Sequence, residues 1–408
     1  MSIFKIYTSA KALTDKQDSK FKFFSAGYLV SVMALFFYSF TQVDLSLTLS
    51  RASIYQYFEK GFQYIGFFNR SLSALFFVLI LLFLFIFYAL ILFEVSKNKI
   101  DRKRLWTIIL LTSVILTFSY NAFSYDLFNY IFDAKIFTHY NLNPYLFKPL
   151  DFPKDPMLSF MHWTHRTYPY GPVWLGITIP LSFAGLNYFL PTFFLFKILV
   201  SASFVGTVIY IKKILNLINP KKALFNVTFF ALNPLVLFEV LVSSHNDMPM
   251  MFFAILAIYL AIKNKWSLGF IIMILSALTK QVTAFLIIPF VFFRVLTYFK
   301  KNFLITTFIK SCLLFSVLGF IYVLTKIEVQ PWYFLWIFIF IPLLNLNKTI
   351  IIFVNGVIIG LLLRYLPFIY FGNWDGIVIN LKLYVTLAVP MLSLLTLAAT
   401  NLLWKTRK

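Results

Sequence analysis

The chain has 408 residues, of which 61% are hydrophobic and 12% are charged, and its mean hydropathy is +0.85. About a quarter of the residues in a soluble domain are charged, so the composition excludes a soluble protein and predicts an integral membrane protein. The formal net charge of +22 does not indicate nucleic-acid binding. The Lys and Arg residues form short clusters between apolar runs, where the positive-inside rule expects them.

Helices, rather than the strands of a barrel, are predicted to cross the membrane. Only helices and closed barrels satisfy all backbone groups in lipid. The apolar runs are continuous and about 20 residues long, as in 71–93, whereas barrel strands alternate over about 10 residues. The single cysteine, Cys312, lies in such a run. This excludes an intramolecular disulfide or a cysteine-based metal site and suggests a small buried side chain.

The predicted spans begin near the N-terminus. The first 22 residues are polar, and the apolar run at 23–40 lacks a small-residue cleavage pattern, so we expect an uncleaved first span. About 12 spans are expected, at 22–41, 71–93, 105–122, 191–211, 223–241, 248–262, 266–279, 281–297, 303–324, 332–346, 349–366 and 381–403. Basic clusters predict cytoplasmic segments at 5–22, 97–104, 212–222, 263–265, 299–301, 348 and 405–408. Both termini are therefore expected to be cytoplasmic.

The apolar segment 172–189 is not needed as a crossing in this topology. Both crossings between the cytoplasmic clusters at 97–104 and 212–222 are already assigned, so this segment should be re-entrant or lie in the membrane interface. Its two prolines, Pro172 and Pro180, favour a broken segment. The alternative is a full span with one basic cluster outside.

Two short spans meet at Lys280. Dividing 266–297 between two crossings leaves about 15 residues each, fewer than a full bilayer requires. The turn that joins them should then lie below the outer surface, where a charge is tolerated only beside a polar cavity. Lys280 is therefore expected to face a cavity, with snorkelling to the interface as the alternative.

The whole chain, residues 1–408, is predicted to form one all-α membrane domain. It divides into an N-terminal tail with two accessory spans (1–104), a core (105–345) and C-terminal spans (346–408). The longest polar segment is 120–174, which holds four of the 14 acidic residues. A loop of this length in a compact fold is usually functional, so we expect the reactive site there, on the extracytoplasmic face.

Two carboxylates open this loop. Asp126 follows a predicted span, where a carboxylate facing an aqueous cavity can serve as a general base. Asp133 lies seven residues later, on about the same face of a short helix. The structural alternatives are that both are solvated surface charges and that Asp133 pairs with Lys135.

Further candidates lie in four polar segments on the same predicted face. Arg166 offers a bidentate fork for phosphate, or contacts a lipid headgroup, and the ring of Tyr170 could stack on a sugar or lie at the headgroup level. The triplet of His245, Asn246 and Asp247 could contact substrate, although Asp247 could instead cap a helix. The remaining candidates are Lys280, Gln281, Gln330, Trp332 and Tyr333.

The order and spacing of five motifs resemble those of the multispanning glycosyltransferases of the GT-C type. The chain is most similar to family 87 and to the polyprenol-phosphate-mannose-dependent α-mannosyltransferases. The motifs are YDLFNYIFDAKIFTHYNLNPY, YPYGPVW, LNPLVLFEVLVSSHND, LTKQVTAFLIIPF and QPWYFLW. They cover roughly residues 105–345. The sequence has no nucleotide-binding Gly-rich motif.

The resemblance implies a catalytic base at Asp126, which would deprotonate an acceptor hydroxyl so that the anomeric carbon is attacked with inversion. A polyprenyl phosphate would leave, and Lys280 would neutralise its charge. His245, Asn246 and Asp247 would hold the sugar or the acceptor. Many relatives carry an adjacent acidic pair where this chain has only Asp126, which weakens any metal requirement, and no cofactor is expected.

The predicted partners are a polyprenyl-phosphate hexose, an acceptor that is a glycan, a lipid or a protein, and the bilayer, which is expected to be the plasma membrane. The main alternative is a transporter or flippase of lipid-linked sugars, although the sequence lacks the repeated halves that are common in transporters. A purely structural membrane protein would not explain Lys280 at membrane depth.

Overall fold

The computed structural model describes residues 2–97, 100–299 and 304–406, and the side chains of residues 19–399 within these ranges. Within the described residues every regular element is a helix and none is a strand, which confirms the all-α prediction. Parts of the basic clusters at 97–104, 299–301 and 405–408 lie outside the described residues.

Four helices form the N-terminal part: α1 (Ser2–Ser39), α2 (Ser53–Gln63), α3 (Arg70–Ser96) and α4 (Arg102–Thr117). Side chains fix two of their starts. The Asn69 side chain accepts a hydrogen bond from the Leu72 amide at the start of α3, and Asp101 accepts one from Lys103 at the start of α4. Such caps satisfy amides that have no partner within the helix.

The middle of the chain folds into α5 (Asp126–Thr138), α6 (Pro172–Ala184), α7 (Phe189–Ile218), α8 (Ala223–Ala231), α9 (Pro234–Val236), α10 (Asp247–Ile262) and α11 (Trp266–Ala277). A π-helical turn, Leu237–Val242, continues α9. The remaining elements are α12 (Ile287–Tyr298), α13 (Ile305–Leu324), α14 (Leu335–Phe338), α15 (Lys348–Leu363), α16 (Leu366–Phe371) and α17 (Ile377–Thr406), with short 3-10 turns at Gln281–Leu286 and Pro331–Phe334.

Seven helical segments in the described part of the chain are long and apolar enough to cross a membrane, so the protein is an integral membrane protein. They are Ser19–Gln42, Arg70–Ser96, Phe189–Ile218, Gln281–Tyr298, Ile305–Leu324, Lys348–Phe371 and Ile377–Ala399. A pair bent by 44°, Ala223–Ala231 and Pro234–Val242, would be an eighth. The expected number of about 12 stays a prediction, because several of the other predicted spans are helices of only 10–17 residues.

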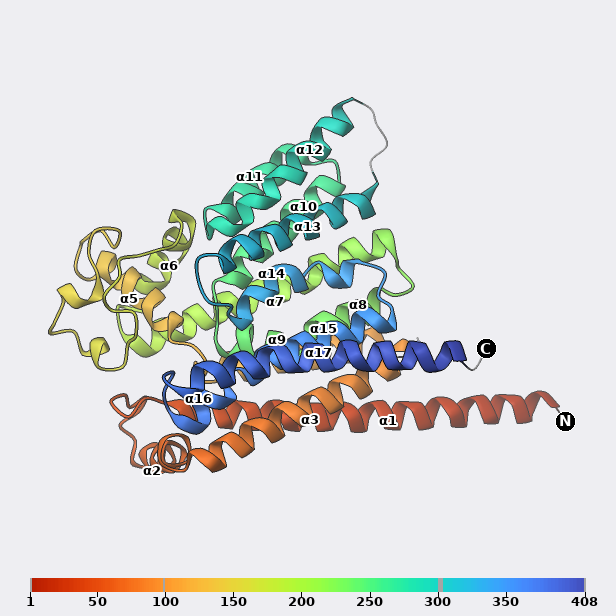
Figure 1. The fold of residues 1–408 in the computed structure, drawn as a ribbon, viewed down its shortest axis with the longest axis horizontal. Helices are drawn as coiled ribbons and strands as arrows, with labels where there is room; N and C mark the ends of the chain where they lie inside the picture. Colours follow the sequence, from red (N-terminus) through yellow and green to blue (C-terminus); the bar gives the residue numbers. More distant parts are fainter. Residues whose placement is uncertain (1, 98–99, 300–303, 407–408) are drawn as a thin grey trace.

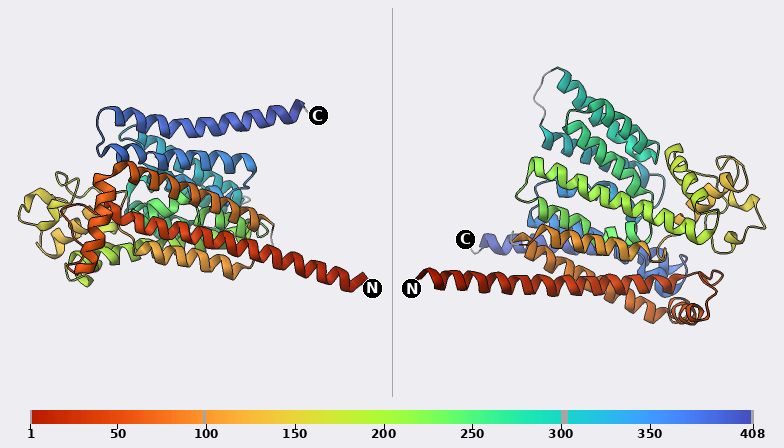
Figure 2. Two further views of the ribbon diagram at one scale, coloured as in Figure 1. Left: turned by 90° about the horizontal axis from the view of Figure 1, so that it is seen from below. Right: turned by 180° about the vertical axis from the view of Figure 1, so that it is seen from behind.

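The two chain ends lie at one end of the helical bundle, and α5 and α6 lie at the opposite end (Figures 1 and 2). The α6 helix packs against α5 and α7 and has 13 residues. A helix of that length is about 20 Å long, shorter than the hydrocarbon core of about 30 Å. The interfacial interpretation of 172–189 remains a prediction that agrees with this length.

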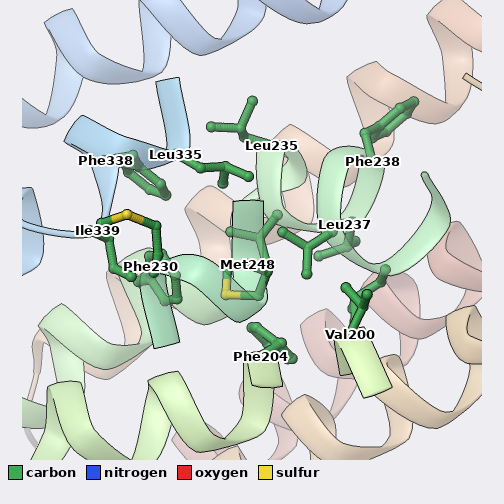
Figure 3. Close-up of a cluster of buried hydrophobic side chains, with 14 of the residues drawn as sticks. Val200, Phe204, Phe230, Leu235, Leu237, Phe238, Met248, Leu335, Phe338 and Ile339 are labelled. Atoms are coloured by element: carbon green, nitrogen blue, oxygen red, sulfur yellow. The ribbon is translucent and has the colours of Figure 1, made fainter. Parts of the chain in front are cut away.

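The bundle is held together by buried apolar side chains. Figure 3 shows one such cluster, in which Phe204 of α7 lies next to Met248 of α10, with Val200 of α7 on one side and Phe230 of α8 on the other. All four side chains are fully buried. Because α10 begins at Asp247, this packing fixes the position of the polar residues that directly precede and begin the helix.

Candidate active site

Asp126 is the first residue of α5, at the end of the bundle opposite the chain termini (Figure 1). Its amide donates a hydrogen bond to the Ser124 hydroxyl, 3.1 Å away. A carboxylate in the first turn of a helix is stabilised by the helix dipole. The side chain is 13% exposed, so it is largely withdrawn from solvent and still accessible.

The central feature of the site is the buried imidazole of His245, which lies between two carboxylates. Its Nδ1 is 3.6 Å from an oxygen of Asp126, and its Nε2 is 3.4 Å from an oxygen of Glu239. The hydroxyl of Tyr365 donates a hydrogen bond to Glu239, with 3.0 Å between the oxygens. Three helical segments that are distant in sequence are thereby joined into one polar chain inside an apolar bundle.

The backbone around His245 has an unusual conformation. The π-helical turn ends at Val242, and Ser244 has a φ of 52°, a left-handed value that is uncommon for residues other than glycine. The buried Lys197 on α7 donates hydrogen bonds to the Val242 carbonyl and the Ser119 hydroxyl, both at 3.0 Å. Strained backbone is often found at functional sites, and here it directs His245 toward Asp126.

The ring of Trp332 covers one face of His245. The two ring centroids are 4.0 Å apart and the rings are inclined by 19°. Trp332 belongs to the 3-10 turn Pro331–Phe334, which carries the QPWY motif. The motif therefore contributes a stacking ring that excludes water from the imidazole.

The neighbouring charges determine the protonation states of His245 and Asp126. Burial alone would lower the pKa of His245, but Asp126 and Glu239 outweigh this effect and raise the pKa to about 9. Burial alone would raise the pKa of Asp126, but His245, Arg166 and Lys280 together lower it below its usual value. At neutral pH an ionised Asp126 therefore faces a protonated His245, and the carboxylate is free to accept a proton.

A second ion pair lies beside the first. The Nζ of Lys280 is 2.9 Å from both carboxylate oxygens of Asp247, and the indole nitrogen of Trp336 donates a hydrogen bond of 2.6 Å to Asp247. The same Nζ lies 5.5–5.8 Å from the ring centroids of Tyr170, Tyr333 and Trp336. Aromatic faces attract a cation at this distance, so the charge of Lys280 is directed into the protein.

The YPYGP motif brings Tyr170 to this position. The amides of Gly171 and Val173 donate hydrogen bonds to the carbonyls of Thr279 and Leu278, at 3.2 and 3.1 Å. A Cβ atom at residue 171 would lie 1.9 Å from the Leu278 oxygen, so only glycine permits this close approach. The loop thus pairs its backbone with the segment that directly precedes Lys280.

Two further loop residues lie close to Asp126. The Nη2 atom of Arg166 lies 3.9 Å from a carboxylate oxygen of Asp126, and the Arg166 side chain is 37% exposed. Asp133 is buried, and this desolvation raises its pKa to about 8. The suggested pairing of Asp133 with Lys135 is wrong. Lys135 pairs with Asp155 at 2.5 Å, because α5 directs it away from the site and toward the 3-10 turn that follows Asp155.

The structure brings together most of the predicted site residues. Gln281 is exposed and Gln330 is half-buried, and no described contact joins either side chain to the cluster. Asn246 is fully buried, and neither polar atom of its side-chain amide has a hydrogen-bond partner among the described residues. A buried amide in this state is suited to binding a polar ligand.

Three residues of the site were missed by the sequence analysis: Glu239, Tyr365 and Trp336. A signal existed for Glu239, because a carboxylate within the apolar run LNPLVLFEVLV would be costly without a function or a partner. Trp336 lies in the QPWYFLW motif, but nothing singled it out from the other rings there, and no signal marked Tyr365 among the 23 tyrosines of an aromatic-rich chain.

A large apolar cavity lies elsewhere in the bundle. It has a volume of about 690 Å³ between α1 and α3 and is lined by apolar side chains such as Phe23, Phe76 and Phe87. It contains no acid–base pair, so the chemistry is assigned to the cluster around Asp126. Among the residues that the structure describes, no group of three or more His, Cys, Asp or Glu side chains is arranged to hold a metal ion.

An apolar helical bundle with a buried carboxylate–histidine cluster at one end is an arrangement that a membrane-embedded enzyme can use. Residues 38–297, more than half of the chain, match the model of the MptA_B family, described as alpha-(1->6)-mannopyranosyltransferase, N-terminal domain. The chain belongs to this family and is a glycosyltransferase, which confirms the resemblance seen in its motifs. No curated protein and no solved structure matches the chain. Trp332, Trp336 and Tyr365 lie beyond the matched segment.

Proposed function

We propose that the protein transfers a hexose, namely mannose, from a polyprenyl-phosphate sugar to an extracytoplasmic glycan, lipid or protein acceptor. The observation that carries this proposal is the ionised, largely buried carboxylate of Asp126 held beside a protonated His245. A general base needs this combination of an available lone pair and a fixed orientation.

In the proposed reaction Asp126 removes the proton from an acceptor hydroxyl, and the hydroxyl oxygen forms a bond to the anomeric carbon. The bond between that carbon and the phosphate oxygen breaks on the opposite face, and the polyprenyl phosphate leaves with the electron pair. Attack from the opposite face inverts the configuration. An α-mannosyl product, as in the family description, would then require a β-linked donor.

The neighbouring residues are assigned supporting roles. His245 orients Asp126, and Asn246 offers buried amide atoms to sugar hydroxyls. Tyr170, Tyr333 and the Asp247–Lys280 pair form an aromatic and charged wall beside the reacting groups. Lys280 would stay paired with Asp247 and stabilise the negative charge of the leaving phosphate from a distance. Arg166 lies on the exposed side of Asp126, where an anionic donor could reach it.

The topology is part of the proposal. We infer about 12 membrane crossings, with both termini cytoplasmic and Asp126 on the extracytoplasmic side of the plasma membrane. The separation of the chain ends from α5 along the bundle supports this orientation (Figure 2). A Lys154→Cys variant should be labelled by an impermeant thiol reagent in intact cells, since Lys154 is exposed and the native Cys312 is buried. Labelling only after permeabilisation would reverse the orientation.

Transfer of radiolabelled mannose from polyprenyl-phosphate mannose by the purified full-length protein tests the reaction. Asp126→Asn should lower the rate by about 10²–10⁴-fold, whereas Asp151→Asn, at an exposed position of the same loop, should retain activity. Equal rates for the wild type and Asp126→Asn would refute the assignment of the base. Translocation of the lipid-linked sugar in vesicles without transfer would favour a flippase.

A further inference from the structure

A second charged cluster joins three distant parts of the chain at the end of the bundle that holds the active site. Its members are Glu328, between α13 and the turn at Pro331, Arg364, which follows α15, and Lys382 on α17. The Nζ of Lys382 lies 2.8 Å from a carboxylate oxygen of Glu328, and the guanidinium of Arg364 pairs with the same oxygen.

The cluster carries more positive than negative charge. Arg364 and Lys382 are almost fully buried, at 3% and 9% exposure of their side chains, whereas the Glu328 side chain is 51% exposed. Among the residues that the structure describes, Glu328 is the only carboxylate paired with either cation. Two buried cations therefore depend on one solvent-accessible anion, although buried charges normally require full compensation.

The cluster is close in sequence to two residues of the active site. Arg364 precedes Tyr365, whose hydroxyl binds Glu239 of the His245 chain. Glu328 lies four residues before Trp332, the residue stacked on His245. Figure 1 shows α16 and the beginning of α17 at the same end of the bundle as α5. Basic residues are expected at the opposite, cytoplasmic end, so topology does not explain this pair.

We propose that Arg364 and Lys382 bind the phosphate of the lipid-linked sugar, and that Glu328 occupies the position of this anion until the phosphate displaces it. This assignment rests on the proposed function and identifies the phosphate subsite of the same active site. A planar guanidinium and an ammonium group converging on one carboxylate oxygen can equally bind phosphate oxygens.

A comparison with Lys280 decides which cations receive the phosphate. The partner of Lys280 is Asp247, which is fully buried and also bound by Trp336, so its carboxylate has no route to water. Glu328 is half exposed and lies in the irregular segment between α13 and Pro331, so it can turn into solvent. Displacing Glu328 costs far less desolvation than displacing Asp247.

The structural alternative is that the cluster only ties α15 and α17 to the loop. A cation after the C-terminus of α15 is favoured by the helix dipole, which accounts for Arg364 without any ligand. In that case Glu328→Gln would lower thermal stability and leave phosphate binding unchanged. The phosphate hypothesis predicts that this substitution strengthens binding, because it removes the competing anion.

The test measures binding of polyprenyl phosphate to full-length protein in phosphatidylcholine nanodiscs. Lys382→Gln should weaken binding about tenfold, and Glu328→Gln should strengthen it about threefold or more, in line with one charge-assisted hydrogen bond lost or one competitor removed. Lys326→Gln is the matched control, because it makes the same charge change at an exposed position two residues from Glu328. Binding equal to wild type is expected for this control.

Two outcomes would overturn the proposal. In the first, Glu328→Gln binds polyprenyl phosphate no more tightly than wild type, and Lys382→Gln binds it as tightly as the control Lys326→Gln. The other is equal competition by phosphatidylglycerol, which would assign the cations to bilayer headgroups instead of the donor. Binding is measured without turnover. A failed mannose transfer would therefore refute the proposed reaction separately from the phosphate subsite.

Discussion

The ammonium group of Lys280 contacts both carboxylate oxygens of Asp247 at 2.9 Å, although the two residues are 33 positions apart in the chain. Asp247 is fully buried and the Lys280 side chain is 17% exposed. The two members therefore differ in their access to water. This difference determines which of the two residues can be replaced with the smaller loss of stability.

Lys280→Met should destabilise the protein more than Asp247→Asn. The first substitution leaves a buried carboxylate without a cation, at a cost of about 3–5 kcal/mol, whereas the second leaves a lysine that can reach solvent. The double variant should lose less than the sum of the two single losses. Unfolding in denaturing detergent measures these differences. Lys154→Met, at an exposed loop position, should unfold like wild type, and additive losses would contradict a direct ion pair.

Gly171→Ala should disrupt the site. The new Cβ atom would lie 1.9 Å from the Leu278 carbonyl oxygen, so the loop must move away from the backbone segment that precedes Lys280. Tyr170 would move with it, and both the melting temperature and the transfer rate should fall. Gly176→Ala is the matched control, because a Cβ there has no neighbour within 4 Å and alanine favours the α6 helix by about 1 kcal/mol. Equal losses in both variants would refute the close approach.

The pH dependence should report on His245. Its pKa is about 9 in the folded protein, above the unfolded value of 6.5. Its contribution to stability is therefore complete below pH 6.5, decreases between pH 6.5 and 9, and is absent above pH 9. The transfer rate should fall over the upper part of this range, as Asp126 loses its cationic partner.

Glu239→Gln should move this fall in activity to lower pH, because one of the two carboxylates that retain the His245 proton is removed. Rate profiles from pH 6 to 10 measure the displacement. His139→Gln, at an exposed histidine on the same loop, should keep the wild-type profile. A Glu239→Gln profile that coincides with wild type would show that His245 does not limit the reaction.

Asp133→Asn should stabilise the protein at alkaline pH. The buried carboxyl has a pKa of about 8, well above the 3.8 of the unfolded chain, so the native state holds a proton that the unfolded chain releases. Stability is therefore lost progressively from about pH 4 to pH 8. The gain from asparagine should grow over the same interval and then remain constant. Asp151→Asn should show no such trend, and a less stable Asp133→Asn at pH 9 would contradict the assignment.

The sequence was most informative where charged residues interrupt apolar runs, because such residues are costly in lipid. Lys280 and the triplet that ends at Asp247 were found because charges are rare in apolar runs, and the structure pairs them. Their pairing with each other could not be predicted, since sequence gives no distance between α10 and the turn after α11. Asp126 was found from its position after a span, but Glu239, the second carboxylate beside His245, was passed over inside an apolar segment.

The loop's aromatic residues were correctly placed near the site but given no specific contacts. Whether Tyr170 stacks on a sugar or lies at the headgroup level stays a prediction, and the structure places its ring near Lys280. That contact depends on the backbone pairing at Gly171, which only the folded chain defines. Similarly, the number of spans depends on bends such as that between α8 and α9, which interrupt runs that appear continuous in hydropathy.

The dispersal of the cluster along the chain has a consequence for biosynthesis. A polypeptide inserted into the membrane from its N-terminus carries Asp126 for about 200 residues before Trp332 is made, and longer before Tyr365. During that interval His245 lacks its stacking ring and Glu239 lacks its hydroxyl donor. A chain that ends within the family-matched segment would hold both carboxylates and the imidazole without these covers. Enzymatic activity should therefore arise only late in membrane insertion, once the final helices have joined the bundle.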